Sequence, residues 1–187
     1  MMKKSLLAGV ALALPLSFAA CSSAGLTPSE TAVAETPAPM SETMQKEVAE
    51  LNKLTRIYID AAALYKQAAD IPDDTKSLKP ALLELAKEKN MQRDLLQDRV
   101  LEIGGKPAEH GEALGTAHRG FTSLRTIVDN DTEVAVEEVL RGERYILEEL
   151  NKAMPNTVTP ETKQLLANLR TDTEREISRL EQIDQAV

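Results

Sequence analysis

Apolar residues recur at alternating steps of three and four along several long stretches of this chain, whereas the two-residue alternation of a strand is not seen. The clearest stretch is a seam of aliphatic, aromatic and small residues: Leu51, Leu54, Tyr58, Ala61, Tyr65 and Ala68. A seam with this heptad spacing buries one face of a helix against neighbouring helices. The pattern therefore predicts an all-α protein folded as an antiparallel four-helix bundle.

Residues that break or cap helices divide this pattern into elements. Pro72 cannot continue a helix, Gly104 and Gly105 are typical of a helix end, and Thr159 followed by Pro160 is typical of a helix start. The predicted helices run from Ser41 or Thr43 to about Ala69, from between Asp74 and Pro80 to Ile103, from Ala113 to Val128, from Asp131 to Met154, and from Pro160 to Ile183. The helix at 113–128 is expected to be a short extra helix before the third long one.

The first 20 residues have the layout of an export signal, with a basic start, an apolar run and an exit of small residues. The apolar run is interrupted by Pro15 and is shorter than the roughly 20 residues that a spanning helix needs. Residues 1–20 are therefore expected to be a signal peptide.

The residues around the single cysteine suggest how the exported chain is held. Phe18-Ala19-Ala20-Cys21 resembles the lipobox of bacterial lipoproteins, although leucine is usual at the position of Phe18. The resemblance implies that Cys21 is lipidated and anchors the chain to the membrane. Ser22 follows, as in lipoproteins sorted to the outer membrane, so the expected location is the periplasmic face of that membrane. Ordinary signal cleavage after Ala19 or Ala24 is the alternative.

Residues 21–41 are rich in Ser, Thr, Ala, Glu and Pro and contain no aromatic residue. Such a segment has too little apolar surface to offset the entropy lost on ordering, so a lipidated, disordered tether is expected there. The bundle is then expected to occupy residues 42–187.

The acidic balance of the chain limits its partners. A formal net charge of -8 and the absence of tryptophan argue against nucleic-acid binding, because an acidic surface repels phosphates. No Ser-His-Asp order, glycine-rich phosphate loop or Cys-His pair is present, so no catalytic residue is assigned.

Glu143 lies inside an apolar stripe that includes Leu140, Ile146 and Leu150. Breaking a buried ion pair and leaving one charge uncompensated costs about 3–5 kcal/mol, so a basic partner is expected. Lys89 and Arg93 lie in the polar middle of the second helix and are the candidates. We therefore predict a structural polar layer formed by Lys89, Arg93 and Glu143.

Four short segments fall in the order and spacing of a bacterial family of ferritin-like four-helix bundles of unknown function. They are Leu51-Asn52-Lys53-Leu54, Gly104-Gly105-Lys106-Pro107, His118-Arg119-Gly120-Phe121 and Arg141-Gly142-Glu143. The chain resembles this family from about Leu51 to Ile183, which implies a ferritin-like fold. It departs from the family where Ala63 replaces a frequent glutamate and Glu174 replaces a frequent histidine.

Ferritin-like di-iron sites take glutamates from all four helices and a Glu-x-x-His pair from two of them. Neither His110 nor His118 follows a glutamate at that spacing. We therefore expect no metal and no cofactor. A site made only of carboxylates, with Glu143, Glu174 and either Asp60 or Glu88, is the alternative.

These observations predict a lipid-anchored protein of the cell envelope that acts as a binding or scaffold module for a protein partner. The competing hypothesis is a ferritin-like carboxylate protein that binds metal or carries out redox chemistry.

Overall fold

The computed structural model describes residues 40–70, 78–111 and 132–185, which belong to one compact unit. They form four α-helices and a short 3-10 turn: α1 (Glu42–Ala68), α2 (Leu78–Glu102), α4 (Thr132–Ala153), the turn Met154–Asn156, and α5 (Pro160–Asp184). These three ranges contain no strand. The all-α prediction is confirmed, and each long helix begins and ends within a few residues of its predicted limits.

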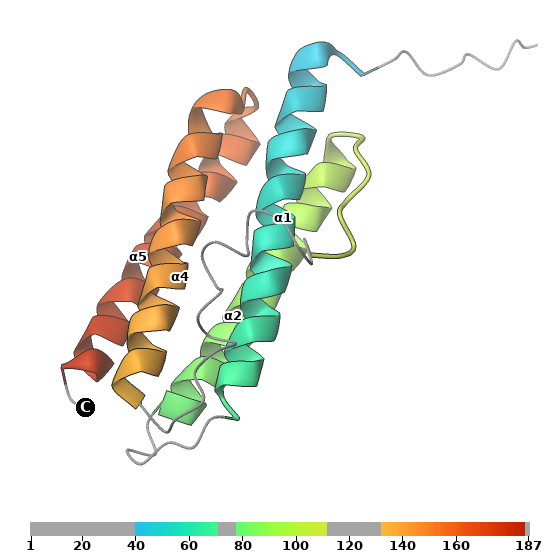
Figure 1. The fold of residues 1–187 in the computed structure, drawn as a ribbon. Helices are drawn as coiled ribbons and strands as arrows, with labels where there is room; N and C mark the ends of the chain where they lie inside the picture. The colour runs from blue at the N-terminus through green and yellow to red at the C-terminus, as the bar shows by residue number, and fades with distance from the viewer. Residues whose placement is uncertain (1–39, 71–77, 112–131, 186–187) are drawn as a thin grey trace, which may run out of the picture. The chain divides into compact units, whose positions relative to one another are not determined.

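The helices pack as two antiparallel pairs, α1 with α2 and α4 with α5 (Figure 1). The chain runs along α1, returns along α2, and then follows α4 in the same direction as α2 before returning along α5 (Figure 1). Of the four pairs of helices that pack side by side, α1–α2 and α4–α5 are in closest contact, and α1–α4 and α2–α5 are in less extensive contact. Side chains nevertheless fill the seam between α2 and α5, where Gln92 and Glu176 are buried.

Local sequence signals fix the helix ends. The Ser41 hydroxyl accepts a hydrogen bond from the Met44 N–H at 3.3 Å and caps the start of α1. At the end of α2, the N–H groups of Gly104 and Gly105 donate to the carbonyls of Leu101 and Val100, which is the Schellman motif. Gly104 has a φ of 81°, a conformation that favours glycine.

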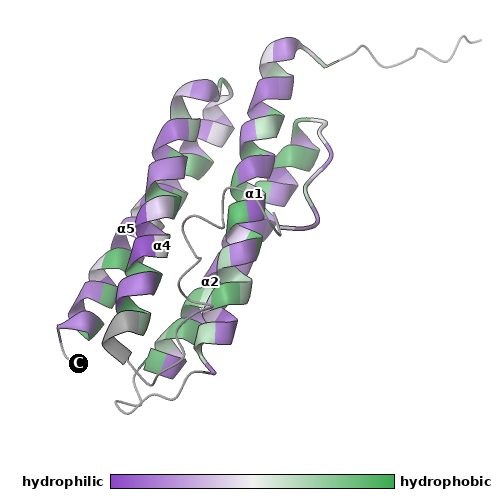
Figure 2. Ribbon diagram, in the orientation of Figure 1, coloured by the Kyte–Doolittle hydropathy of each residue, from purple (hydrophilic) through white to green (hydrophobic). Residues whose placement is uncertain are grey.

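The apolar seams form one buried core. Every member of the predicted α1 seam is at most 4% exposed, from Leu51 to Ala68. Figure 2 shows hydrophobic and hydrophilic residues along each helix, as amphipathic helices require. The core also contains residues from the other three helices: Leu82, Leu85, Leu96, Val136, Val139, Ile146, Leu150, Leu166, Leu169 and Leu180.

The segment after α2 is fixed to the α1–α2 pair by two side chains. The Asn52 amide donates to the Lys106 carbonyl at 2.9 Å and accepts from the Ala108 N–H at 2.6 Å. Gln97 donates to the Ala108 carbonyl at 2.7 Å. The part of the chain up to Gly111 therefore lies against the bundle.

Several predicted features lie outside the described residues: the signal peptide, Cys21, most of the tether and the helix at 113–128. Within the described ranges, none of the helices combines the length and the apolar character needed to cross a membrane.

Candidate functional site

A group of polar side chains interrupts the apolar core near the middle of α2 and α4. Lys89 extends from α2, Glu143 from α4 and Glu176 from α5, and Tyr58 and Tyr65 of α1 complete the group. We call these five residues the polar layer. Each stands in the apolar seam of its helix, so the helical repeat that builds the core also directs these side chains inward.

Lys89 lies at the centre of the polar layer. Its ammonium nitrogen is 2.8 Å from Oε2 of Glu143 and 2.5 Å from Oε2 of Glu176. The three side chains are at most 2% exposed. Gln92 adds a hydrogen bond of 3.3 Å to Oε1 of Glu176. One buried cation of α2 thus links two carboxylates from two other helices.

The two tyrosines cover the α1 side of this ion group. The Lys89 ammonium lies 5.4 Å from the centroid of the Tyr58 ring, a distance typical of a cation–π contact. Tyr65 lies beside Glu143, and burial together with the Glu143 carboxylate raises the pKa of the Tyr65 hydroxyl. Both tyrosines are fully buried. The heptad pattern predicts core rings with hydroxyls at the rim of the bundle, and the second part of that prediction is wrong because both hydroxyls are buried.

Burial and charge act against each other in the polar layer. Burial disfavours the ammonium of Lys89, but Glu143, Tyr58 and Glu176 together raise its pKa above the ordinary value. For Glu143 burial is the larger effect, and it raises the pKa from 4.5 to about 7 although Lys89 acts in the opposite direction. Lys89 is thus firmly charged, whereas Glu143 can hold a proton near neutral pH.

Glu88 joins the layer from its outer side. This residue of α2 is partly exposed and lies close enough to Glu176 for the two carboxyl groups to repel each other. Burial and the neighbouring Glu176 raise the pKa of Glu88. The carboxyl groups of Glu88, Glu176 and Glu143 therefore extend from the α2–α5 seam into the core.

The structure brings Lys89 and Glu143 together but places Arg93 elsewhere. The Arg93 guanidinium donates to Asp94 at 2.6 Å and to Asn90 at 2.7 Å, at the surface of α2. Its assignment to the polar layer is therefore corrected. Arg93 is about one helical turn beyond Lys89, and its hydrogen bonds to Asn90 and Asp94 keep it on the surface of its own helix.

The glutamate of α5 in the layer is Glu176, which sequence reasoning missed in favour of Glu174. Glu174 is 54% exposed and lies 3.7 Å from Arg170. The signal was present in the seam of α5, where Leu166, Leu169, Thr173, Glu176 and Leu180 follow one another at steps of three and four and are all buried. Polar residues at these positions belong to the seam as much as the leucines do.

The polar layer does not fit a metal centre of the ferritin-like type. Within the three described ranges, no group of three or more His, Cys, Asp or Glu side chains is arranged to hold a metal ion. His110 is exposed, and His118 lies outside the described residues. The Lys89 ammonium already contacts both inward carboxylates, and a metal ion at that point would meet a fixed positive charge.

A second buried carboxylate, Glu47 of α1, holds the start of α5. It accepts hydrogen bonds from the N–H groups of Val158 and Thr159 at 2.7 and 3.1 Å and from the hydroxyls of Thr159 and Thr162. Although burial works against it, these donors lower the pKa of Glu47. Thr159 is the N-cap residue as predicted, but its hydroxyl accepts from no N–H of α5 and is hydrogen-bonded to Glu47 and to the Thr162 hydroxyl. Glu47 thus holds the residues that lead into α5 from another helix.

Comparisons with known proteins agree with this fold. A protein-family model described as "Domain of unknown function (DUF2383)" matches residues 46–156, which is more than half of the chain. A search of curated protein sequences found no match.

Two solved structures show the same architecture. A ferritin-like, diiron-carboxylate protein from Bacillus anthracis str. Ames is 15% identical with a TM-score of 0.62, and the match covers 78% of this chain and 99% of that one. A DPS protein from Vibrio cholerae O1, a member of a broad superfamily of ferritin-like diiron-carboxylate proteins, is 14% identical with a TM-score of 0.63, covering 78% and 98%. At these identities the likeness concerns the fold, and it confirms the predicted ferritin-like four-helix bundle.

Proposed function

We propose that this chain, which belongs to the family described as the domain of unknown function DUF2383, is a lipid-anchored protein of the cell envelope. Its ferritin-like bundle would bind another protein and act as a scaffold module. In this proposal the interior of the bundle stabilises the fold, and the outer surface makes the functional contacts.

The observation that carries the proposal is the position of Lys89. Ferritin-like metal centres need several inward carboxylates and histidines around a shared cation. In this chain the inward carboxylates Glu143 and Glu176 already share a cation that belongs to α2. The described helices therefore keep the ferritin-like architecture with a protein cation between their inward carboxylates.

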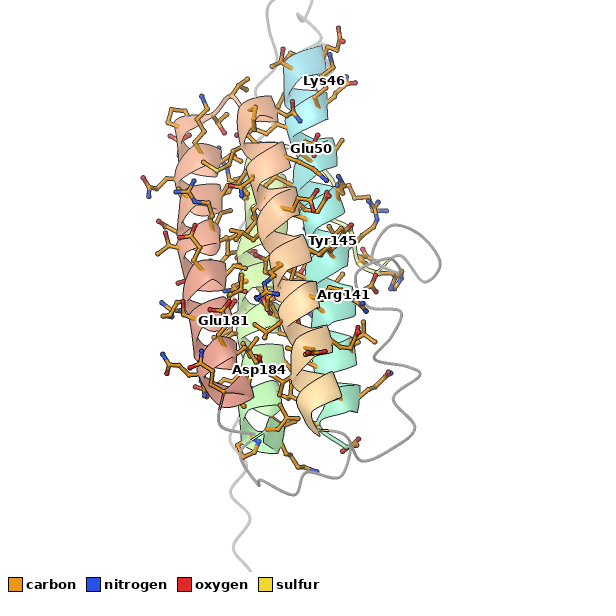
Figure 3. All side chains as sticks on the ribbon, turned by 60° about the vertical axis from the view of Figure 1, so that its left-hand side comes forward. Lys46, Glu50, Arg141, Tyr145, Glu181 and Asp184 are labelled. Atoms are coloured by element: carbon orange, nitrogen blue, oxygen red, sulfur yellow. The ribbon has the colours of Figure 1, made fainter. Side chains whose placement is uncertain are left out.

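The outer surface suits a polar protein partner. Charged residues labelled in Figure 3 are partly or fully exposed on three helices: Lys46 and Glu50 on α1, Arg141 on α4, and Glu181 and Asp184 on α5. A shallow hollow between α4 and the end of α5 is lined by residues of both signs: Glu137, Glu138, Leu140, Arg141, Arg144 and Asp184. Charges of both signs favour a protein surface over the uniformly anionic surface of a nucleic acid.

The anchor part of the proposal rests on the lipobox-like residues before Cys21 and on the composition of residues 21–41. Cys21→Ala in the full-length chain should move the protein from the membrane fraction to the soluble envelope fraction and remove its acyl label, while the circular dichroism of the bundle stays helical. Unchanged membrane retention of this variant would exclude the anchor.

A metal test separates the proposal from the alternative of a ferritin-like metal-binding or redox protein. The chain without its signal segment should melt at the same temperature with chelator and with added iron or manganese. Glu143→Gln is the matched variant, because it removes one possible ligand charge while keeping the side-chain shape. Stabilisation by metal in the wild type that is absent from Glu143→Gln would overturn the proposal.

A further inference from the structure

The polar layer contains more acidic groups than its one cation can balance. Glu143, Glu176 and the adjoining Glu88 contribute three carboxyl groups, whereas Lys89 contributes one ammonium. With both Glu143 and Glu176 ionised, the buried ion group carries one uncompensated negative charge, and an ionised Glu88 at its partly exposed edge adds a second. Such charges are costly in a medium of low dielectric constant, and binding a proton removes one of them.

Glu88 faces this ion group from the outer side of α2. Burial and the neighbouring Glu176 raise the pKa of Glu88. Two carboxylates close together repel each other, so a proton on one of them relieves the repulsion. Lys89 and Gln92 already donate to Glu176, and Lys89 also contacts Glu143, so an ionised Glu88 would add negative charge to a pair of carboxylates that shares one cation.

We propose that the bundle core is a proton-binding site, in which Glu88, Glu143 and Glu176 together hold one exchangeable proton around Lys89 and exchange it with solvent along the α2–α5 seam.

The groups that face Glu143 from the other helices fit this assignment. From α1, Tyr65 and Tyr58 lie close to it, and burial raises the pKa of both tyrosines, so they stay neutral. From α2, Lys89 supplies the positive charge, and from α5, Glu176 supplies a second carboxyl group. The acidic members of the layer are thus the groups that can change protonation near neutral pH.

The path to solvent runs through Glu88. This residue faces Glu176 and Arg179 of α5 and is partly exposed. Beyond it, Glu84 and Arg179 form an exposed ion pair at 2.5 Å across the same seam. Glu84 raises the pKa of Glu88 and Arg179 lowers it, both less strongly than burial and Glu176 act. The carboxyl groups thus form a short series from the surface to Glu143.

The proposal predicts a direction for the effect of pH on stability. The folded chain raises the pKa of Glu143 from 4.5 to about 7, so it binds the proton more tightly than the unfolded chain does. The stabilisation that the folded chain gains from binding this proton is complete below pH 4.5 and is lost as the pH rises through 7. Over that interval the ratio of folded to unfolded protein should fall by about two orders of magnitude. Acidification towards pH 5 therefore stabilises the bundle.

The test is denaturant unfolding of the bundle from pH 5 to pH 8 in the wild type, Glu143→Gln, Glu88→Gln and Glu174→Gln. We call the change in the free energy of unfolding with pH the slope. A glutamine in place of Glu143 or Glu88 is neutral without binding a proton, so both variants should lose most of this slope. Glu174→Gln is the matched control, because Glu174 is exposed on the same helix as Glu176, and it should keep the wild-type slope. At pH 5, Glu143→Gln should be as stable as the wild type, which verifies that it folds.

A titration of the glutamate side chains by carbon-13 NMR gives an independent readout. One carboxyl resonance should titrate near pH 7 in the wild type and in Glu174→Gln and should be absent from Glu143→Gln. A flat wild-type stability profile, or a slope that survives in Glu143→Gln, would overturn the proton site. A full slope in Glu88→Gln would overturn the assignment of Glu88 to it.

Discussion

Replacing Lys89 with methionine should be more damaging than replacing any single carboxylate of the polar layer. Lys89 has two ionic partners, Glu143 and Glu176, and all three groups are buried. Loss of either glutamate leaves Lys89 paired with the other. Loss of Lys89 leaves two carboxylates facing each other in the core, with no cation between them.

The expected cost follows from this geometry. Removing one partner of a buried ion pair costs about 3–5 kcal/mol, and methionine fills most of the volume of the lysine stem, so little of the loss comes from a cavity. This loss is a large share of the about 5–15 kcal/mol by which a domain of this kind is stable. Because Lys89→Met strands two carboxylates, it should be the least stable single variant of the layer. In Lys89→Met, the carboxyl groups of Glu143 and Glu176 should bind one proton more than they do in the wild type. The difference in the free energy of unfolding between this variant and the wild type should therefore shrink by about 2–3 kcal/mol from pH 7 to pH 5.

The assay is urea unfolding followed by circular dichroism at both pH values. Lys87→Met is the matched control, since Lys87 is exposed two residues away on α2, and it should change stability by less than about 0.5 kcal/mol. The triple variant Lys89→Met, Glu143→Gln, Glu176→Gln removes the stranded charges and should recover much of the loss. A cost below about 1 kcal/mol at pH 7, or a cost that does not depend on pH, would refute the reasoning.

Three further substitutions test the ends of the helices. Glu47→Ala should cost about 2–3 kcal/mol, because it removes the acceptor for two N–H groups and two hydroxyls at the start of α5. Since those donors lower the pKa of Glu47, the difference in the free energy of unfolding between Glu47→Ala and the wild type should narrow as the pH falls below 4.5. A difference that stays constant with pH would contradict this account. Gly104→Ala should cost about 1 kcal/mol through its positive φ, measured by the shift of the urea midpoint. Gly105→Ala should cost about 1–3 kcal/mol because its Cβ would lie 2.8 Å from Val48 and 2.9 Å from Val100. Val48→Ala should therefore relieve part of the cost of Gly105→Ala and none of the cost of Gly104→Ala.

The ends of the helices could be predicted from the sequence because local chemistry determines them. Ser41, Gly104 and Thr159 each act within one turn of their own position, through a side-chain cap, a positive φ or the start of a helix. The burial of the α1 seam was equally predictable, because its spacing leaves it a single face on which to pack.

The candidate site was less predictable because it depends on how the helices are placed relative to one another. Lys89 and Arg93 are four residues apart and project from similar faces of α2, so periodicity could not decide which of them reaches α4. Glu174 and Glu176 project from different faces of α5, and attention to apolar residues alone overlooked the polar position in the seam. The position of the tyrosine hydroxyls depended in turn on where the ion group lies in the core.

The link between Glu47 and the start of α5 also has a mechanical meaning. Glu47 lies six residues after the cap of α1, whereas the apolar seam begins one turn later at Leu51. A chain pulled from its N-terminal side would first straighten these six residues, lengthening by about 10 Å before the force reaches the core. The load would then pass from α1 to α5 through a cluster of hydrogen bonds that must break together. The first turns of α1 would thus absorb a small extension while the bundle behind Glu47 keeps its packing.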